Sequence, residues 1–213
     1  MTKFSAAGGS ASGGYAPNMS RFILVTGGAR SGKSRFAVEL AKSLGRRIVY
    51  VATGKATDEE MRWRIARHRR ERPRSWRTIE ASEPAQAILH VPEATDGILL
   101  DCLTMEVSAR LVRGDTDRAI ERRIRALCEA IQHAACPVIV VTNEVGAGVV
   151  PVSALGRRFR DIAGVANQIA AGFADEVYLL VAGIPLHMKG RLSSKLEAGS
   201  SKLETRGWHA MEH

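Results

Sequence analysis

The clearest chemical motif is the run FILVTGGARSGKS at residues 22–34, which contains Gly27-x4-Gly32-Lys33-Ser34. This spacing is typical of a phosphate-binding loop, as are the apolar run before it and the helical periodicity after it. Glycines let backbone N–H groups approach phosphate oxygens, while the lysine contacts the β- and γ-phosphates and the serine holds Mg²⁺. We therefore predict a triphosphate site formed by Gly27, Gly28, Ala29, Arg30, Ser31, Gly32, Lys33 and Ser34.

Asp101 is a second candidate, because it closes the apolar run at residues 97–100. A carboxylate at the tip of a buried strand can hold Mg²⁺ directly or through water. Thr53, Gly54 and Lys55 follow another apolar run, at residues 47–52. The carboxyl ends of parallel strands meet at one edge of a sheet, so we expect these residues beside the phosphate-binding loop.

His68 lies in a segment that contains eight arginines between residues 62 and 77. On a helical wheel it falls within an arc of about 40° together with Met61, Ile65 and Arg72. One interpretation is a histidine that packs on its helix and bonds to a backbone carbonyl. The other is a nucleophile that attacks phosphorus, with arginines neutralising the triphosphate. The residues alone leave both open.

The elements that must position these residues alternate along the chain. Strands are predicted at residues 22–26, 47–53, 76–80, 97–101, 137–143 and, as the last, 176–181. Helices are predicted at 34–44, 58–70, 84–89, 104–111, 116–133 and 153–171. Continuous Val/Ile/Leu strands between helices indicate a parallel sheet that is covered on both faces. The predicted fold class is α/β, a P-loop NTPase with a mostly parallel sheet.

The composition favours one folded unit with two polar ends. We predict a single domain at residues 21–188, a disordered Gly/Ser-rich arm at 1–20, and a tail at 189–213 that is disordered or of artificial origin. No apolar run approaches the roughly 20 residues of a membrane span. The three cysteines lack metal-ligand spacing and suggest reduced thiols. We expect a soluble cytoplasmic protein.

The net charge of +9 raises the question of a nucleic-acid partner. Much of the excess is the arginine segment, which has only Trp63 and Trp76 for stacking and matches no nucleic-acid module. A polyanionic small molecule such as a nucleoside triphosphate explains the charge at least as well. We expect no nucleic-acid partner, with a nucleic-acid-stimulated ATPase as the alternative.

Several motifs in this order resemble one enzyme family. The strings ILVTGGARSGKS, YVATG, DEEMRWRIARHRRERPRSWRTIE, ILLDCLT, VTNEVGAGVVP and FRDIAGVANQ are similar to the adenosylcobinamide kinase / adenosylcobinamide-phosphate guanylyltransferase family of cobalamin biosynthesis. The resemblance covers about residues 22–188. It implies a RecA-like domain that phosphorylates adenosylcobinamide with ATP or GTP, then transfers GMP from GTP to adenosylcobinamide phosphate through a guanylyl-histidine. It also implies a homo-oligomer, often a trimer.

The resemblance also implies roles for single residues. His68 would be the guanylylated residue and Lys33 the second catalytic one, with Mg²⁺ held by Ser34 and Asp101. The nucleotide site would include Thr53, Gly54, Lys55, Arg69, Arg70, Glu71, Arg72, Glu80 and Asp101. Glu80 is a plausible partner for guanine, whose N1–H and N2–H₂ are adjacent donors. The glycine-rich loop at 144–151 is a hypothesis for corrinoid contact or subunit packing. The alternative function is a plain P-loop kinase of a small metabolite with a structural His68.

Overall fold

The computed structural model describes residues 20–54, 59–70 and 72–190. The predictions for the arm before residue 20 and for the tail after residue 190 therefore lie outside the described residues. No helix in the described ranges is both long enough and apolar enough to cross a membrane.

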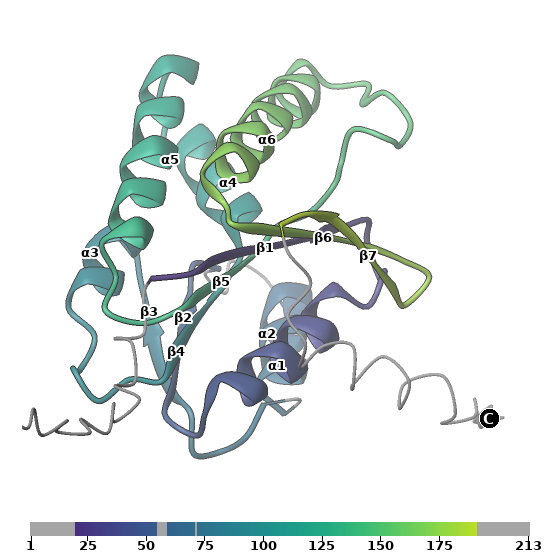
Figure 1. Cartoon of the computed structure of the whole chain (residues 1–213). Coiled ribbons are helices and arrows are strands. Elements are labelled where there is room, and N and C mark those ends of the chain that lie inside the picture. Colours follow the sequence, from purple (N-terminus) through teal and green to yellow (C-terminus); the bar gives the residue numbers. More distant parts are fainter. Residues whose placement is uncertain (1–19, 55–58, 71, 191–213) are drawn as a thin grey trace, which may run out of the picture.

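A seven-stranded sheet forms the centre of the molecule, with the strand order β3-β2-β4-β5-β1-β6-β7 (Figure 1). Neighbouring strands are parallel except for β6 and β7, which are antiparallel. The strands are β1 Phe22–Gly27, β2 Ile48–Ala52, β3 Arg77–Glu80, β4 Gly97–Asp101, β5 Val138–Val141, β6 Glu176–Val181 and β7 Ile184–Lys189. The predicted α/β fold with a mostly parallel sheet is confirmed.

Helices cover both faces of this sheet, as predicted. Figure 1 shows α1 and α2 below the sheet and the other helices above it. They are α1 Lys33–Leu44, α2 Glu59–Arg70, α3 Pro84–Leu89, α4 Leu103–Val112, α5 Asp117–Gln132 and α6 Ala154–Phe173. Two of them begin at side-chain caps, because the hydroxyls of Thr116 and Ser153 accept bonds from the N–H groups of Ala119 and Gly156.

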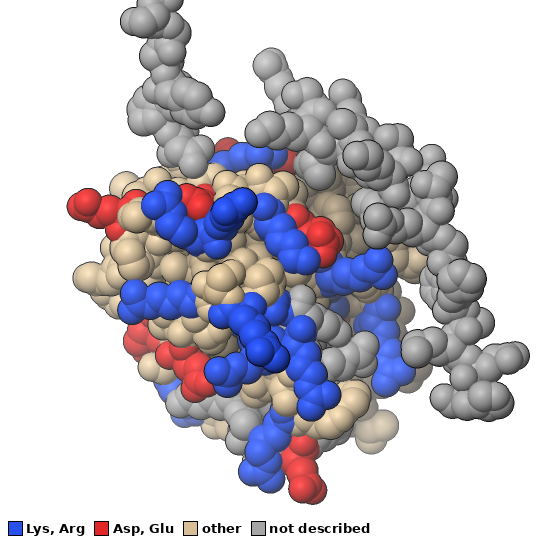
Figure 2. All heavy atoms as spheres, turned by 90° about the horizontal axis from the view of Figure 1, so that it is seen from below, with Lys and Arg blue, Asp and Glu red and all other residues tan. Residues whose placement is uncertain are grey.

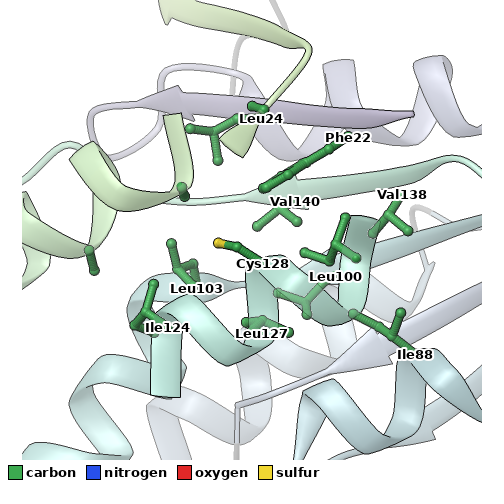
Figure 3. Packing of buried hydrophobic residues seen from close by; sticks show 14 of the residues in the cluster. Phe22, Leu24, Ile88, Leu100, Leu103, Ile124, Leu127, Cys128, Val138 and Val140 are labelled. Carbon is green, nitrogen blue, oxygen red and sulfur yellow. The ribbon is translucent and has the colours of Figure 1, made fainter. Parts of the chain in front are cut away.

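Each face of the sheet has its own apolar core, because successive strand residues point to opposite faces. Phe22, Leu24, Leu100 and Val140 point toward α4 and α5, as Figure 3 shows. The intervening residues, such as Ile23, pack with α1 on the other face. The strands are thereby fixed from both sides, and their carboxyl ends form a rigid edge.

The prediction that residues 176–181 form the last strand is wrong, because β7 follows and pairs with β6. The connection is the two residues Ala182 and Gly183, with φ of 50° and 85°. Positive φ at both positions suits a tight hairpin turn, whose twist matches that of the flanking strands. The run IPLHMK does alternate, but its apolar residues Ile184, Leu186 and Met188 face outward and Pro185 interrupts it, which is unusual within a strand. The sequence signal for this strand was therefore weak.

Several predicted boundaries differ by one or two residues, and the start of β3 has a clear cause. Strand β3 begins at Arg77 and not at Trp76, because the N–H of Trp76 bonds to the carbonyl of Pro73 in a turn. The indole of Trp76 is buried in the core beside α1.

Candidate functional site

The carboxyl ends of five strands place the predicted site residues in one row. Ala52 of β2 pairs with Glu80 of β3 on one side and with Asp101 of β4 on the other. Asp101 pairs in turn with Val141 of β5, and Val141 with Val25 of β1. With about 4.8 Å between neighbouring strands, the four steps from β3 to β1 span roughly 19 Å. Glu80 and the loop after β1 therefore contact different parts of any ligand along this edge.

The phosphate-binding loop follows β1 and depends on glycine at two positions. A Cβ on Gly27 would lie 2.6 Å from the hydroxyl of Ser31 and 2.7 Å from the carbonyl oxygen of Leu180. Gly32 has φ of 91° and caps the start of α1. Any other residue would clash at the first position and be strained at the second.

Lys33 lies at the mouth of this loop and is buried, with 8% of its surface exposed. Its Nζ donates a hydrogen bond of 2.9 Å to the carbonyl oxygen of Gly28. Burial lowers the pKa of Lys33, while electrostatic attraction from Cys102 and Asp101 opposes that shift. A buried ammonium at this position would interact strongly with a phosphate group that replaced the carbonyl as its partner.

The turn of the β6–β7 hairpin contacts the phosphate-binding loop directly. The N–H of Gly183 donates to the carbonyl of Ser31 at 2.9 Å. A Cβ on Gly32 would lie only 3.2 Å from the Cα of Gly183. The sequence analysis did not predict this contact between the hairpin and the loop. The feature that could have indicated the hairpin turn is the Val-Ala-Gly-Ile run at residues 181–184, which has glycine at the second turn position.

Asp101 is held by a tyrosine that the sequence analysis also missed. The hydroxyl of Tyr50 donates to Asp101 Oδ2 at 2.7 Å, and burial raises the pKa of Tyr50. The guanidinium of Arg72 stacks on the Tyr50 ring, with its carbon 3.4 Å from the ring centroid. Burial lowers the pKa of Arg72. This cation–π contact brings the segment after α2 to Asp101, as expected if Arg72 belongs to the nucleotide site.

For several other predicted residues around α2, the structure describes the backbone alone or does not describe the residue. His68 is in α2, but the structure describes its backbone and not its side chain, so the predicted grouping with Met61 lies outside the described side chains. Arg69 and Arg70 are exposed at the end of α2. Lys55 and Glu71 lie outside the described residues. Figure 2 shows that Lys and Arg are far more numerous than Asp and Glu on the face that carries α1 and α2.

Hydroxyl and amide side chains connect the strand ends that follow β2, β4 and β5. The hydroxyl of Thr53 donates to the carbonyl of Cys102 at 2.7 Å and accepts from its N–H at 2.9 Å. Thr104 accepts from the N–H of Asn143 at 2.7 Å. Asn167 of α6 accepts from Thr142 and donates to the carbonyl of Asn143. These buried bonds fix the backbone beside Asp101 and the phosphate-binding loop.

Glu80 ends β3 with its carboxylate exposed, as a ligand-binding group requires. The segment that follows it is anchored by Arg110 of α4, which the sequence analysis did not single out. Arg110 donates to the carbonyl of Ser82 and to Glu83, each at 2.8 Å, and to Glu106 at 2.7 Å. Because Arg110 is buried, this network holds the Glu80 end of the row in place.

Comparison with protein-family models matches residues 23–188 to the family described as cobinamide kinase / cobinamide phosphate guanyltransferase. The chain is 43% identical over 180 residues to the bifunctional adenosylcobalamin biosynthesis protein CobU of Escherichia coli, covering 78% of this chain and 99% of that protein. The corresponding protein of Salmonella typhimurium gives the same values. CobP of Pseudomonas aeruginosa is 43% identical over 168 residues, covering 78% of this chain and 96% of CobP.

Proposed function

Because the chain belongs to the cobinamide kinase / cobinamide phosphate guanyltransferase family, we propose that one row of strand ends performs both reactions. The protein is an enzyme of cobalamin biosynthesis that uses nucleotide substrates. In the first reaction it phosphorylates adenosylcobinamide. In the second it transfers GMP from GTP to adenosylcobinamide phosphate and releases pyrophosphate. The observation that carries this proposal is the row itself, with the phosphate-binding loop at one end, Asp101 between and Glu80 at the other.

In the kinase reaction the hydroxyl of the corrinoid side chain attacks the γ-phosphorus of ATP or GTP. Lys33 would leave the carbonyl of Gly28 and neutralise charge on the transferring phosphoryl group. The backbone N–H groups of the loop and the start of α1 would hold the remaining phosphates. The buried setting of Lys33 makes this stabilisation stronger than it would be in water.

Guanylyl transfer requires a nucleophile for the α-phosphorus of GTP, and we assign this role to His68. The bond between the imidazole and the α-phosphorus forms as the bond to pyrophosphate breaks, and the phosphate of adenosylcobinamide phosphate then takes the GMP group. The position of Arg72, four residues after His68 and stacked on Tyr50, supports this assignment. It ties the end of the helix that carries His68 to the Asp101 part of the row.

Mg²⁺ fits the oxygen groups near the loop. Ser34 is the second residue of α1, and the carboxylate of Asp101 ends β4. Within the described residues no group of three or more His, Cys, Asp or Glu forms a complete metal cage. That suits Mg²⁺, which is usually bound through one or two protein oxygens together with phosphates. We propose Ser34 and Asp101 as its ligands; when bound, the ion would neutralise phosphate charge.

Subunit assembly and location are further parts of the proposal. The apolar side chains of Val181, Ile184, Leu186 and Met188 are about half or more exposed on the edge hairpin. Exposed apolar groups along an open sheet edge support a homo-oligomer, for which we propose a trimer. Cys102, Cys128 and Cys136 are buried free thiols, which supports a reducing compartment such as the cytoplasm.

Labelled GTP tests the proposed pair of reactions. Label at the γ-position is expected to reach adenosylcobinamide, while label at the α-position is expected to appear on the protein. A phosphoramidate at histidine would make the protein label acid-labile and base-stable, and adenosylcobinamide phosphate would remove it. Transfer of γ-label without any α-label on the protein would contradict guanylyl transfer and favour the plain kinase.

Replacement of Glu80 by alanine is expected to reduce the preference for GTP over ATP in guanylyl transfer by about 10- to 100-fold. The reason is loss of charge-assisted hydrogen bonds to guanine, which are worth about 1.5–3 kcal/mol. The measurement is kcat/KM for both nucleotides. Glu129→Ala, at an exposed glutamate on α5, is the control and is expected to leave the ratio unchanged. An unaltered ratio in Glu80→Ala would show that another group reads the base.

A further inference from the structure

Glu144 is a carboxylate at the phosphate-binding loop that has no assigned chemical role. It follows β5, which lies between β4 with Asp101 and β1 with the loop. Its backbone N–H donates to the carbonyl oxygen of Gly27 at 2.9 Å. Gly27 is the first residue of the phosphate-binding loop. The backbone of Glu144, which follows the neighbouring strand β5, therefore contacts this loop.

The same contact places Glu144 near Lys33. The ammonium of Lys33 bonds to the carbonyl of Gly28, which is the carbonyl next to the one that Glu144 contacts. Adjacent carbonyl oxygens are separated by only one residue, so Lys33 Nζ and the backbone nitrogen of Glu144 lie within roughly 11 Å of each other. Lys33 is the group that reaches the β- and γ-phosphates in such a loop. The backbone of Glu144 therefore lies beside the loop residues that are proposed to bind the β- and γ-phosphates.

The structure holds this glutamate in place while leaving part of its carboxylate available. Asn143, the preceding residue, is fixed through its N–H by Thr104 and through its carbonyl by Asn167. Glu144 Oε1 accepts a bond of 2.8 Å from the N–H of Gly146. Its other carboxylate oxygen has no hydrogen-bond partner among the described residues. The side chain is half-buried, so one oxygen is positioned and the other can meet a substrate.

The kinase reaction needs a group in this position. The attacking hydroxyl must lose its proton as it bonds to the γ-phosphorus, and a carboxylate within hydrogen-bond reach can accept that proton. Two other carboxylates follow strands along the row. Asp101 lies two strands from β1 and is bonded by Tyr50, whereas Glu80 lies four strands away. Glu144, which follows the strand next to β1, is the best placed of the three.

We propose that Glu144 is the general base of the kinase reaction. The corrinoid hydroxyl oxygen forms a bond to the γ-phosphorus, the bond from that phosphorus to the bridging oxygen breaks, and the nucleoside diphosphate leaves with the electron pair. The hydroxyl proton passes to the free oxygen of Glu144 and then to water. This role rests on the kinase activity proposed above. The sequence analysis gave corrinoid contact or subunit packing as the hypothesis for residues 144–151. For Glu144, the first residue of that loop, the role of general base replaces corrinoid contact.

Glu144→Gln tests the role, because glutamine keeps an oxygen for the N–H of Gly146 but cannot serve as the base. The expected result is a fall in kcat for adenosylcobinamide phosphorylation of about 10²- to 10⁴-fold with KM for both substrates nearly unchanged. Glu144→Asp is expected to recover part of this loss. Guanylyl transfer, assayed with adenosylcobinamide phosphate as the acceptor, is expected to stay within about threefold of wild type. This retained activity would also show that the variant is correctly folded.

The outcomes separate this inference from the proposed function. Glu93→Gln, at an exposed glutamate in the connection before β4, is the matched control and is expected to leave both reactions unchanged. A higher KM for adenosylcobinamide with normal kcat in Glu144→Gln would assign the residue to corrinoid binding and overturn its role as base. Equal loss of both reactions would assign it to support of the loop and would also overturn the role. Failure of the wild-type chain to phosphorylate adenosylcobinamide would contradict the proposed function itself.

Discussion

Replacing His68 by alanine is expected to abolish guanylyl transfer, by a factor of at least about 10⁴, and to leave kinase activity within about threefold of wild type. The two reactions place different phosphorus atoms next to their acceptors. In the proposed mechanism only the attack on the α-phosphorus needs the imidazole, whereas the γ-phosphoryl group passes directly to the corrinoid hydroxyl. The measurement is each half-reaction assayed separately, together with protein labelling by α-labelled GTP, which is expected to disappear.

His90→Ala is the matched control for this experiment. His90 is the C-cap of α3 and is exposed, and its ring nitrogen bonds to the carbonyl of Gln86 four residues before it. The His90→Ala variant loses only a hydrogen bond within its own helix, so the rates of both reactions are expected to stay near those of wild type. If His68→Ala folded normally but lost both reactions to the same degree, His68 would be a structural residue and the guanylyl-histidine assignment would be wrong.

Lys33→Ala is expected to impair both reactions, with kcat/KM lower by about 10²- to 10³-fold or more in each. In the proposed mechanism the ammonium contacts phosphates that both reactions use, and its buried position strengthens that contact. Folding is expected to be preserved, because the variant removes a desolvated charge whose only hydrogen bond within the described residues is to the carbonyl of Gly28. The measurements are both half-reactions, nucleotide affinity and thermal unfolding.

Lys42→Ala provides the control on the same helix. Lys42 is in the last turn of α1, exposed and paired with Glu39, so it has the same charge without access to the strand ends. Both reactions are expected to be unaffected. Full retention of either reaction in Lys33→Ala would mean that this reaction does not depend on the phosphate-binding loop, and the single shared site would be contradicted.

The parts of the site that the sequence predicted are those with local signals. The loop at residues 27–34 follows from its spacing together with the apolar run before it and the helical periodicity after it. Asp101 follows from an apolar run that ends in a carboxylate. The alternation of strands and helices then sets the sheet and which strand ends lie at the same edge. These features depend on neighbours in the chain, so a single sequence is enough to infer them.

The missed residues act through contacts between distant segments. Tyr50 looks like an ordinary core residue of a strand until its hydroxyl is seen at Asp101. Arg110 looks like one of many helix arginines until its bonds to Ser82 and Glu83 are known. Asn167 lies in a helix of mixed composition and only the fold brings it to Asn143. Residue type and spacing carry no information about such pairs.

The contact between Gly183 and the phosphate-binding loop limits how the chain can vary. Both glycines have positive φ, and a Cβ on Gly32 would lie 3.2 Å from the Cα of Gly183, so glycine is favoured at each position. A chain that ended after β6 would contain every motif residue of the nucleotide site. It would still lack the N–H that holds Ser31 and the backbone against which the loop turns. The proposed nucleotide site therefore depends on the chain through the β6–β7 hairpin, beyond the last residue of the motifs.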